Sequence, residues 1–196
     1  MKNNLSFLCF AFILIFPASL KLSAQTLSDA VTKGDTVLAL QLIKSGADPN
    51  KPDETGSTPL LAACRWGNIP MVKLLLANGA NADQPRSGKG RTPLIVACAY
   101  YSGITVVKLL IGKGADVNAT SNDGSTPLML AANNAKLDVV EYLLAKGADA
   151  RKKDLTGLMA LDYAQKADPG VFGTAGIKDC QLDKGAVITR LIPLSH

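Results

Sequence analysis

The sequence predicts an all-α fold: a helix-turn-helix solenoid of about five repeats, joined by short β-hairpin-like loops. One set of glycines recurs at spacings of 34, 34 and 33 residues, at Gly56, Gly90, Gly124 and Gly157. A second set recurs at spacings of 33, 35 and 33 residues, at Gly46, Gly79, Gly114 and Gly147. A fixed period in the low thirties indicates stacked supersecondary units rather than one globular core.

Each regular repeat opens with a helix start. In three copies the opening glycine leads to Thr-Pro-Leu, beginning at Thr58, Thr92 and Thr126. A threonine hydroxyl can accept a hydrogen bond from an unpaired N–H of the first helical turn. Proline at the next position gives up no hydrogen bond and presets φ for the helix. These threonines are therefore the expected N-caps.

Each repeat also contains a helix stop. An apolar helical run, such as residues 106–110, precedes each glycine of the second set. Glycine just past such a run adopts the left-handed conformation of a C-cap without steric cost. Two helical patterns lie between start and stop, as in residues 60–65 and 70–77 on either side of the turn Gly67-Asn68. The unit is therefore helix, turn, helix, loop.

The combined pattern, GxTPLxxAA followed by VVKLLLxxGADVN, resembles the ankyrin repeat over about 170 of the 196 residues. The resemblance implies one ankyrin repeat domain over residues 25–196, with units at about 25–55, 56–88, 89–123, 124–156 and 157–196. The position after Thr-Pro-Leu, often histidine in this family, is Leu61, Ile95 or Met129 here, with Asp162 in the last copy. Apolar packing should replace imidazole hydrogen bonds at these positions.

Three units are irregular. The first lacks Thr-Pro-Leu, as expected of a terminal repeat with one face in water. The third has one extra residue in the loop before it and one in its turn, around residues 101–103. The fifth breaks at 168–170, and residues 184–194 predict a returning helix, so this unit is a C-terminal cap with an insertion. Residues 171–180 are either a floppy turn or a loop folded onto the concave face.

Residues 1–24 have the pattern of a secretory signal peptide. Lys2 precedes an uncharged apolar run at residues 5–16, and Ser23-Ala24-Gln25 offers a cleavage site, although Leu22 is larger than peptidases usually prefer. The alternative is a membrane anchor, but twelve apolar residues fall short of the roughly 20 needed to span a bilayer. We expect an exported protein, periplasmic or secreted, without stable membrane insertion after signal cleavage.

The charge balance argues against nucleic acid as a partner. Loss of Lys2 and Lys21 with the signal leaves 19 basic and 16 acidic residues, so the net charge falls from +5 to +3. No run of five or six like charges is present. The small basic clusters on predicted loops have the composition of ordinary solvated loop tips.

The cysteines predict free thiols in the folded body. Cys64 and Cys98 occupy the same position of adjacent units. Equivalent helices of such units stack about 8 to 10 Å apart, whereas a disulfide needs Cα atoms within about 7 Å. Cys9 leaves with the signal, and Cys180 in the irregular tail is the cysteine expected to react or cross-link.

Catalytic chemistry has little support. The only histidine is His196, the last residue, so a Ser-His or Cys-His relay or a His-rich zinc site cannot form in the folded body. Asp48, Asp116 and Asp149 recur at one phase, which indicates turn formation. Asn118 opens a formal glycosylation sequon, but the repeat pattern already accounts for it. We predict no enzyme activity, no cofactor and no metal.

The surface carries the functional prediction. Loops and first helices of such a stack line a concave groove. The resemblance places partner contacts just before the opening glycine and just after the Ala-Ala of the first helix. The expected contact residues are Arg65, Trp66, Tyr100, Tyr101, Asn133 and Asn134, with Arg86, Lys89 and Arg91 as a basic rim. Trp, Tyr and Arg often carry interface energy, whereas the alternative is that Trp66 and Tyr100 only cover the seam between repeats.

The sequence thus predicts an exported, monomeric, non-enzymatic module that binds another protein through its groove. One alternative is a membrane-tethered envelope scaffold whose signal is never cleaved. A second, by analogy with ankyrin-like proteins that carry bacterial signal peptides, is an effector or immunity-type protein. An enzyme would require chemistry that the sequence does not display.

Overall fold

The computed structural model describes residues 26–100, 102–166 and 184–194. The predicted signal peptide, Tyr101, Cys180 and His196 lie outside these residues, as does the segment 168–183. The described residues form ten α-helices and no strand. The helices are α2 Leu27–Lys33, α3 Thr36–Lys44, α4 Pro59–Arg65, α5 Ile69–Ala77, α6 Pro93–Ala99, α7 Ile104–Gly112, α8 Pro127–Asn133, α9 Leu137–Ala145, α10 Ala160–Lys166 and α11 Lys184–Leu191, followed by the 3-10 helix η1 Ile192–Leu194.

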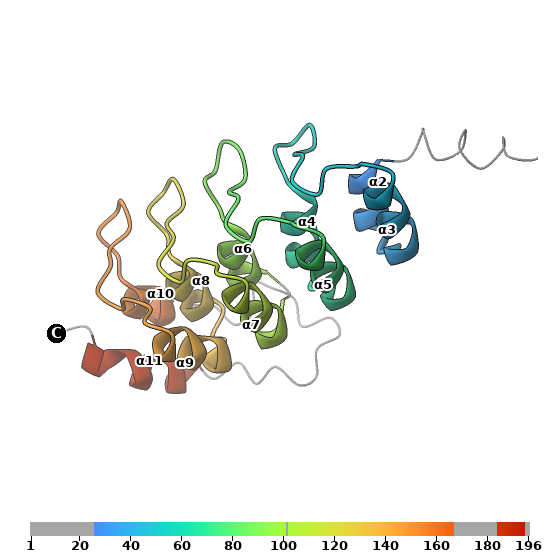
Figure 1. Cartoon of the computed structure of the whole chain (residues 1–196). Coiled ribbons are helices and arrows are strands. Elements are labelled where there is room, and N and C mark those ends of the chain that lie inside the picture. The colour runs from blue at the N-terminus through green and yellow to red at the C-terminus, as the bar shows by residue number, and fades with distance from the viewer. Residues whose placement is uncertain (1–25, 101, 167–183, 195–196) are drawn as a thin grey trace, which may run out of the picture.

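The helices form two parallel rows, as Figure 1 shows. The first helices of successive units, α2, α4, α6, α8 and α10, contact one another in order. The second helices, α3, α5, α7, α9 and α11, do the same. The four loops between units project from the same side of the stack. The predicted all-α solenoid is therefore confirmed.

The helix starts and stops lie where the sequence predicts them. Thr58, Thr92 and Thr126 accept hydrogen bonds from the backbone N–H three residues later, at 3.3, 3.4 and 3.2 Å. The first unit, which lacks Thr-Pro-Leu, is capped by Thr26 in a reciprocal capping box with Asp29. The closing glycines have φ between 86° and 98°, the left-handed conformation of a helix C-cap.

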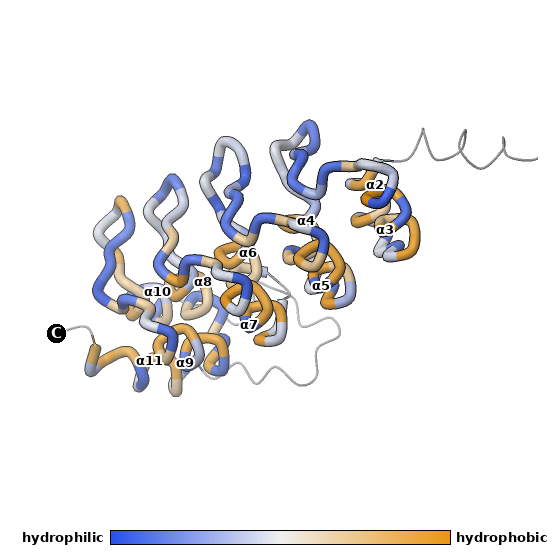
Figure 2. The backbone as a smooth tube through the Cα atoms, viewed as in Figure 1, coloured by the Kyte–Doolittle hydropathy of each residue, from blue (hydrophilic) through white to orange (hydrophobic). Residues whose placement is uncertain are grey.

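The core lies between the two rows, where Figure 2 shows the apolar stretches of the helices. Leu61, Ile95 and Met129, at the position often held by histidine, are at most 2% exposed, so apolar packing holds them. Asp162 at the same position caps α10 instead, since its carboxylate accepts the N–H of Met159 at 2.7 Å. The predicted apolar packing is therefore confirmed at Leu61, Ile95 and Met129, and it is wrong at Asp162, where a carboxylate forms a hydrogen bond instead.

Cys64 and Cys98 are buried free thiols, as predicted. Burial raises the pKa of both, and the neighbouring Cys98 raises that of Cys64 further. The pKa of Cys98 rises to about 12, although Lys136 opposes the effect of burial. Both side chains therefore stay protonated and behave as small core residues.

The loops between units are tight hairpins, each closed by a backbone bond across its base. Its donor is the N–H of Asp53, Arg86, Ser121 or Asp154, and its acceptor is the carbonyl of the residue before the next helix N-cap. In two loops the aspartate also locks the turn: Asp53 and Asp154 each accept from N–H groups two and four residues later. For Asp154 these bonds, with others from the hydroxyls of Thr156 and Tyr163, outweigh the effect of burial and lower the pKa to about 2.

Asparagine side chains link neighbouring loops. The Asn50 amide donates to the Gly79 carbonyl at 2.9 Å and accepts from the N–H of Asn81 at 2.7 Å. Asn118 makes the equivalent pair with Gly147 and Asp149, both at 2.9 Å. The asparagine of the formal sequon therefore serves the repeat, as the sequence predicts. Asp48, Asp116 and Asp149 accept local backbone N–H groups and form turns, also as predicted.

The C-terminal cap differs from the predicted single helix over residues 184–194. Helix α11 ends at Leu191 and a 3-10 turn follows, because Pro193 has no N–H to continue the α-helical ladder. Val187 and Leu191 are buried, and α11 contacts both α9 and α10.

In the described part of the chain no helix has the length and apolar character required to span a bilayer.

The opening glycines provide a test of how tightly the loops stack. Gly124 has φ +81°, and a Cβ there would lie 2.9 Å from the Cα of Asp154 in the next loop. Gly157 has φ +84°, but among the described atoms none lies within 4 Å of its Cβ position. Gly157→Ala should cost only left-handed strain, about 1 to 2 kcal/mol. Gly124→Ala should cost a further 1 to 3 kcal/mol, roughly, for the steric overlap.

Urea unfolding of the two variants measures this difference, with Gly157→Ala as the matched control. Equal losses of unfolding free energy would show that the loops separate easily and that the contact at Gly124 is not a constraint.

Candidate functional site

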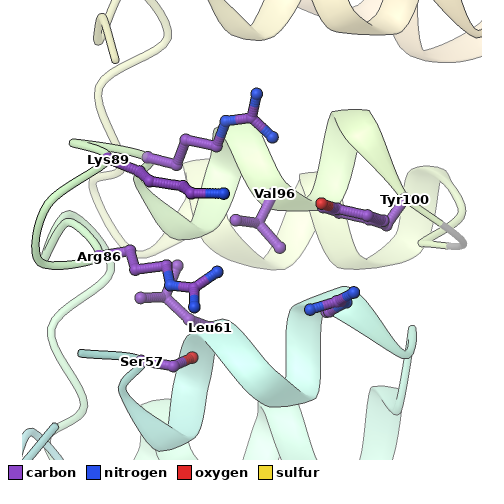
Figure 3. Close-up of a pocket in the computed structure, with 8 residues that line it drawn as sticks. Ser57, Leu61, Arg86, Lys89, Val96 and Tyr100 are labelled. Carbon is purple, nitrogen blue, oxygen red and sulfur yellow. The ribbon is translucent and has the colours of Figure 1, made fainter. Parts of the chain in front are cut away.

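Five of the nine predicted contact residues line a single cleft. It lies between α4, α6 and the loop before α6, and it is open to solvent. We call it the α4–α6 cleft; its lining is Ser57, Leu61, Arg65, Arg86, Lys89, Arg91, Val96 and Tyr100. Figure 3 shows Arg86 and Lys89 reaching from the loop toward the apolar floor at Val96. The predicted groove contacts and the predicted basic rim thus form one surface.

A stack of one cation and two aromatic rings lies at the far end of this cleft. The Arg65 guanidinium carbon is 4.9 Å from the centroid of the Tyr100 ring and 6.0 Å from that of Trp66. Contacts at these distances are favourable cation–π interactions. Tyr100 is half-buried and packs against the core, whereas the Trp66 side chain is 61% exposed. The largest apolar surface here therefore faces solvent.

The loop before α6 supplies three cations. The Arg86 guanidinium donates to the Thr55 carbonyl at 3.4 Å, but its Nε is buried and lacks a hydrogen-bond partner among the described residues. Arg91 lies 3.9 Å from the Asp123 carboxylate. Lys89 is exposed at the loop tip. These groups are held by weak contacts and remain able to take an additional acceptor.

The two asparagines stand apart from the cleft. The Asn134 amide donates to the carbonyls of Cys98 and Ala99, both at 3.2 Å, and to Leu130 at 2.7 Å. Its nitrogen therefore closes the end of α6. Asn133 is half-buried on α8 and is not part of the cleft lining. Tyr101 lies outside the described residues, so its predicted contact stays a prediction.

Residues that the sequence did not single out fix the shape of the site. Leu61 was expected only to pack in the core, and Val96 was not singled out, yet both line the floor of the cleft. Lys136 of the fourth unit donates to the carbonyls of Ala97, Tyr100 and Ser102 at the end of α6. This turn contains the extra residue of the third unit. A lysine after a predicted helix carries no signal for such a role, because its partners are 34 to 39 residues away.

Comparison with known proteins identifies the family. The sequence matches the family described as ankyrin repeats (3 copies) over residues 27–121 and again over residues 99–171. The chain belongs to the ankyrin-repeat family. Relatives include neurogenic locus notch homolog protein 4 of Homo sapiens, 41% identical over 109 residues, which are 55% of this chain and 5% of that protein.

Two further relatives show how widely the repeats occur. The ankyrin repeat protein FPV031 of fowlpox virus (strain NVSL) is 38% identical over 134 residues, 65% of this chain and 39% of that protein. The 2-5A-dependent ribonuclease of Mus musculus is 43% identical over 72 residues, 36% of this chain and 10% of that protein. The ankyrin chain described here spans only a minor part of each relative. The repeats generally mediate protein–protein interaction, and what is shared is the repeat module.

Replacing each aromatic side chain by alanine tests whether it is free to contact a partner or is needed to cover the junction between two repeats. Trp66→Ala should change the free energy of unfolding by less than about 0.5 kcal/mol, because the side chain is largely in solvent. Tyr100→Ala should lower it by roughly 1 to 3 kcal/mol, because the ring packs on the core. Chemical denaturation of both variants measures the two values. A loss at Trp66 as large as that at Tyr100 would mean that Trp66 covers the seam.

Proposed function

We propose that this ankyrin-repeat protein is an exported, monomeric, non-enzymatic binding module that holds another protein on the surface formed by the α4–α6 cleft and Trp66. The observation that carries the proposal is the arrangement of Trp66, Arg65 and Tyr100 across two adjacent units. An exposed tryptophan beside an oriented arginine is the composition of an interface hot spot. The partner gains affinity by burying Trp66, and the loop cations set its orientation.

Rigidity supports this assignment. The Tyr100 ring is packed on the core, and Arg65 stacks on it. Lys136 and Asn134 of the next unit donate to backbone carbonyls at the end of α6, which carries Tyr100. Side chains that are already ordered lose less conformational entropy when a partner binds. The surface is therefore prepared for binding before the partner arrives.

Export is proposed on the sequence of residues 1–24 alone. The proposed mature protein begins at Gln25 and is not anchored in the membrane. N-terminal sequencing of the protein purified from its producing cells tests this proposal. A first residue of Gln25 supports export with signal cleavage, and a first residue of Met1 supports the tethered-scaffold alternative instead.

The binding surface is tested by affinity capture from envelope and secreted fractions with the purified chain, followed by titration of the recovered partner. Trp66→Ala should lower the affinity for that partner by about 30-fold or more, the usual effect of losing a hot-spot residue. Val37→Ala is the matched control, since Val37 is 67% exposed on α3 outside the cleft. Circular dichroism checks that both variants stay folded. Equal binding by both variants would place the interface elsewhere.

A further inference from the structure

The α4–α6 cleft concentrates positive charge at one junction of the stack. Arg65 comes from the end of α4, whereas Arg86, Lys89 and Arg91 come from the loop before α6. One neighbouring carboxylate is Asp123, which lies 3.9 Å from Arg91. Another is Asp53: burial raises its pKa, but hydrogen bonds from Thr55 and Ser57 and the charge of Arg86 outweigh burial, so the pKa is lowered. Four cations thus face two carboxylates, and the cleft has excess positive charge.

The equivalent positions at the other junctions are not cationic in this way. Equivalence follows from the backbone bond that closes each loop and from the start of each first helix. At the next junction, between α6 and α8, the residues equivalent to the four cations are Ala99, Ser121, Asp123 and Ser125. Between α8 and α10 they are Asn133, Asp154, Thr156 and Leu158. Between α2 and α4 they are Lys33, Asp53, Thr55 and Ser57. The repeat therefore folds without a cation at the three loop positions, whereas the position of Arg65 is also basic at the junction before it, as Lys33. The three loop cations are thus a feature of this junction that the fold does not require.

Arg86 shows most clearly that the cleft departs from the repeat. It stands where Asp53 and Asp154 lock their own loops with a carboxylate. Exchange of that anion for a guanidinium removes the lock and turns a positive group toward the cleft. The buried Nε of Arg86 has no acceptor in the described structure, and an unsatisfied buried donor costs about 1 to 3 kcal/mol. Arg86 also lines the cleft, so an anion bound there can pair with the positive charge of its guanidinium.

The spacing of the cations selects the kind of anion. Arg65 closes α4, and Ser57, at the other end of the cleft, precedes α4. A helix of seven residues is about 10 Å long, so one small anion cannot contact both ends. An extended peptide rises about 3.3 Å per residue, so several carboxylates spaced along a short acidic segment can reach both ends. Asp53 and Asp123 beside the cleft would repel a long continuous polyanion such as a nucleic acid backbone, but they leave room for a short acidic segment.

We propose that the α4–α6 cleft binds a short acidic segment of the protein partner, with Asp or Glu carboxylates on Arg86, Lys89, Arg91 and Arg65 and its backbone over Leu61 and Val96. This inference rests on the proposed function and names the chemistry of its partner. Guanidinium–carboxylate pairs of this kind give directional, charge-assisted hydrogen bonds. Trp66, next to Arg65, buries adjoining apolar residues of the same partner.

The test uses the full chain and a hexaglutamate peptide that is acetylated and amidated, so that only side chains carry charge. Trp66 is the single tryptophan, and its fluorescence reports binding beside Arg65. Hexaglutamate should cause a saturable change, at least tenfold tighter than hexaglutamine. Raising the salt from about 25 to 250 mM should weaken it several-fold, because screening shortens the range of the attraction. Equal binding of the two peptides would overturn the proposal.

The cleft variant exchanges each loop cation for a residue that a neighbouring loop carries at the equivalent position: Arg86→Ser, Lys89→Thr and Arg91→Ser. It should bind hexaglutamate at least tenfold more weakly. The control, Lys44→Gln, Lys73→Gln and Lys113→Gln, removes the same charge from exposed sites outside the cleft and should bind within about twofold of the unaltered chain, since distant charges are screened. If the triple variant unfolds, a double variant, Lys89→Thr and Arg91→Ser, replaces it. The double variant keeps the contact between Arg86 and Thr55 and should still bind hexaglutamate more weakly than the unaltered chain.

Two further outcomes would overturn the inference. One is tighter binding of inorganic phosphate or hexathymidylate than of hexaglutamate, which would assign the cleft to phosphate groups. The other is a partner that the Trp66→Ala variant no longer binds but that the cleft variant binds unchanged. That result would support partner binding at Trp66 and refute the acidic segment in the cleft. Conversely, hexaglutamate binding that needs the cleft, together with a partner that Trp66→Ala retains, would support the cleft and refute the proposed groove.

Discussion

Contact between neighbouring units is the constraint on which the rest of this structure depends. No single helix pair buries its apolar face alone. Each first helix packs on the second helix of its own unit and on the first helix of each neighbouring unit. The same is true of the loops, where Asn50 and Asn118 bond to the next loop and Gly124 leaves no room for a side chain. Stability in such a stack accumulates from one interface to the next, so a surface residue can change freely only where it takes no part in these contacts.

The α4–α6 cleft uses that freedom. Its floor, Leu61 and Val96, belongs to the inter-unit core, whereas its three loop cations occupy positions that hold no cation at the other junctions. The fold fixes where these side chains stand and leaves their identity open. An acidic partner segment would therefore be recognised by residues whose exchange costs the stack little, which is the usual separation of site from scaffold.

The irregular third unit shows how the stack absorbs insertions. Its extra loop residue lies in the segment that carries Arg86 and Lys89, and its extra turn residue follows Tyr100. The turn is held by Ser102, which is buried and donates to the Cys64 carbonyl, and by Lys136 of the next unit. Both insertions thus fall beside the cleft, and the neighbouring units supply the donors that the altered backbone needs.

The sequence by itself determined the repeat and its helix boundaries, because caps such as Thr58, Thr92 and the closing glycines act within a few residues of one another. It also determined the buried thiols and the apolar replacements at Leu61 and Ile95, since these follow from phase alone. Only the tertiary structure decided that Arg65 stacks on Tyr100, that Arg86 and Lys89 share a cleft with them, and that Asn134 closes α6 instead of facing a partner. These contacts join residues 11 to 36 positions apart. Rotamers and loop geometry, which periodicity does not specify, decide which of the contacts form.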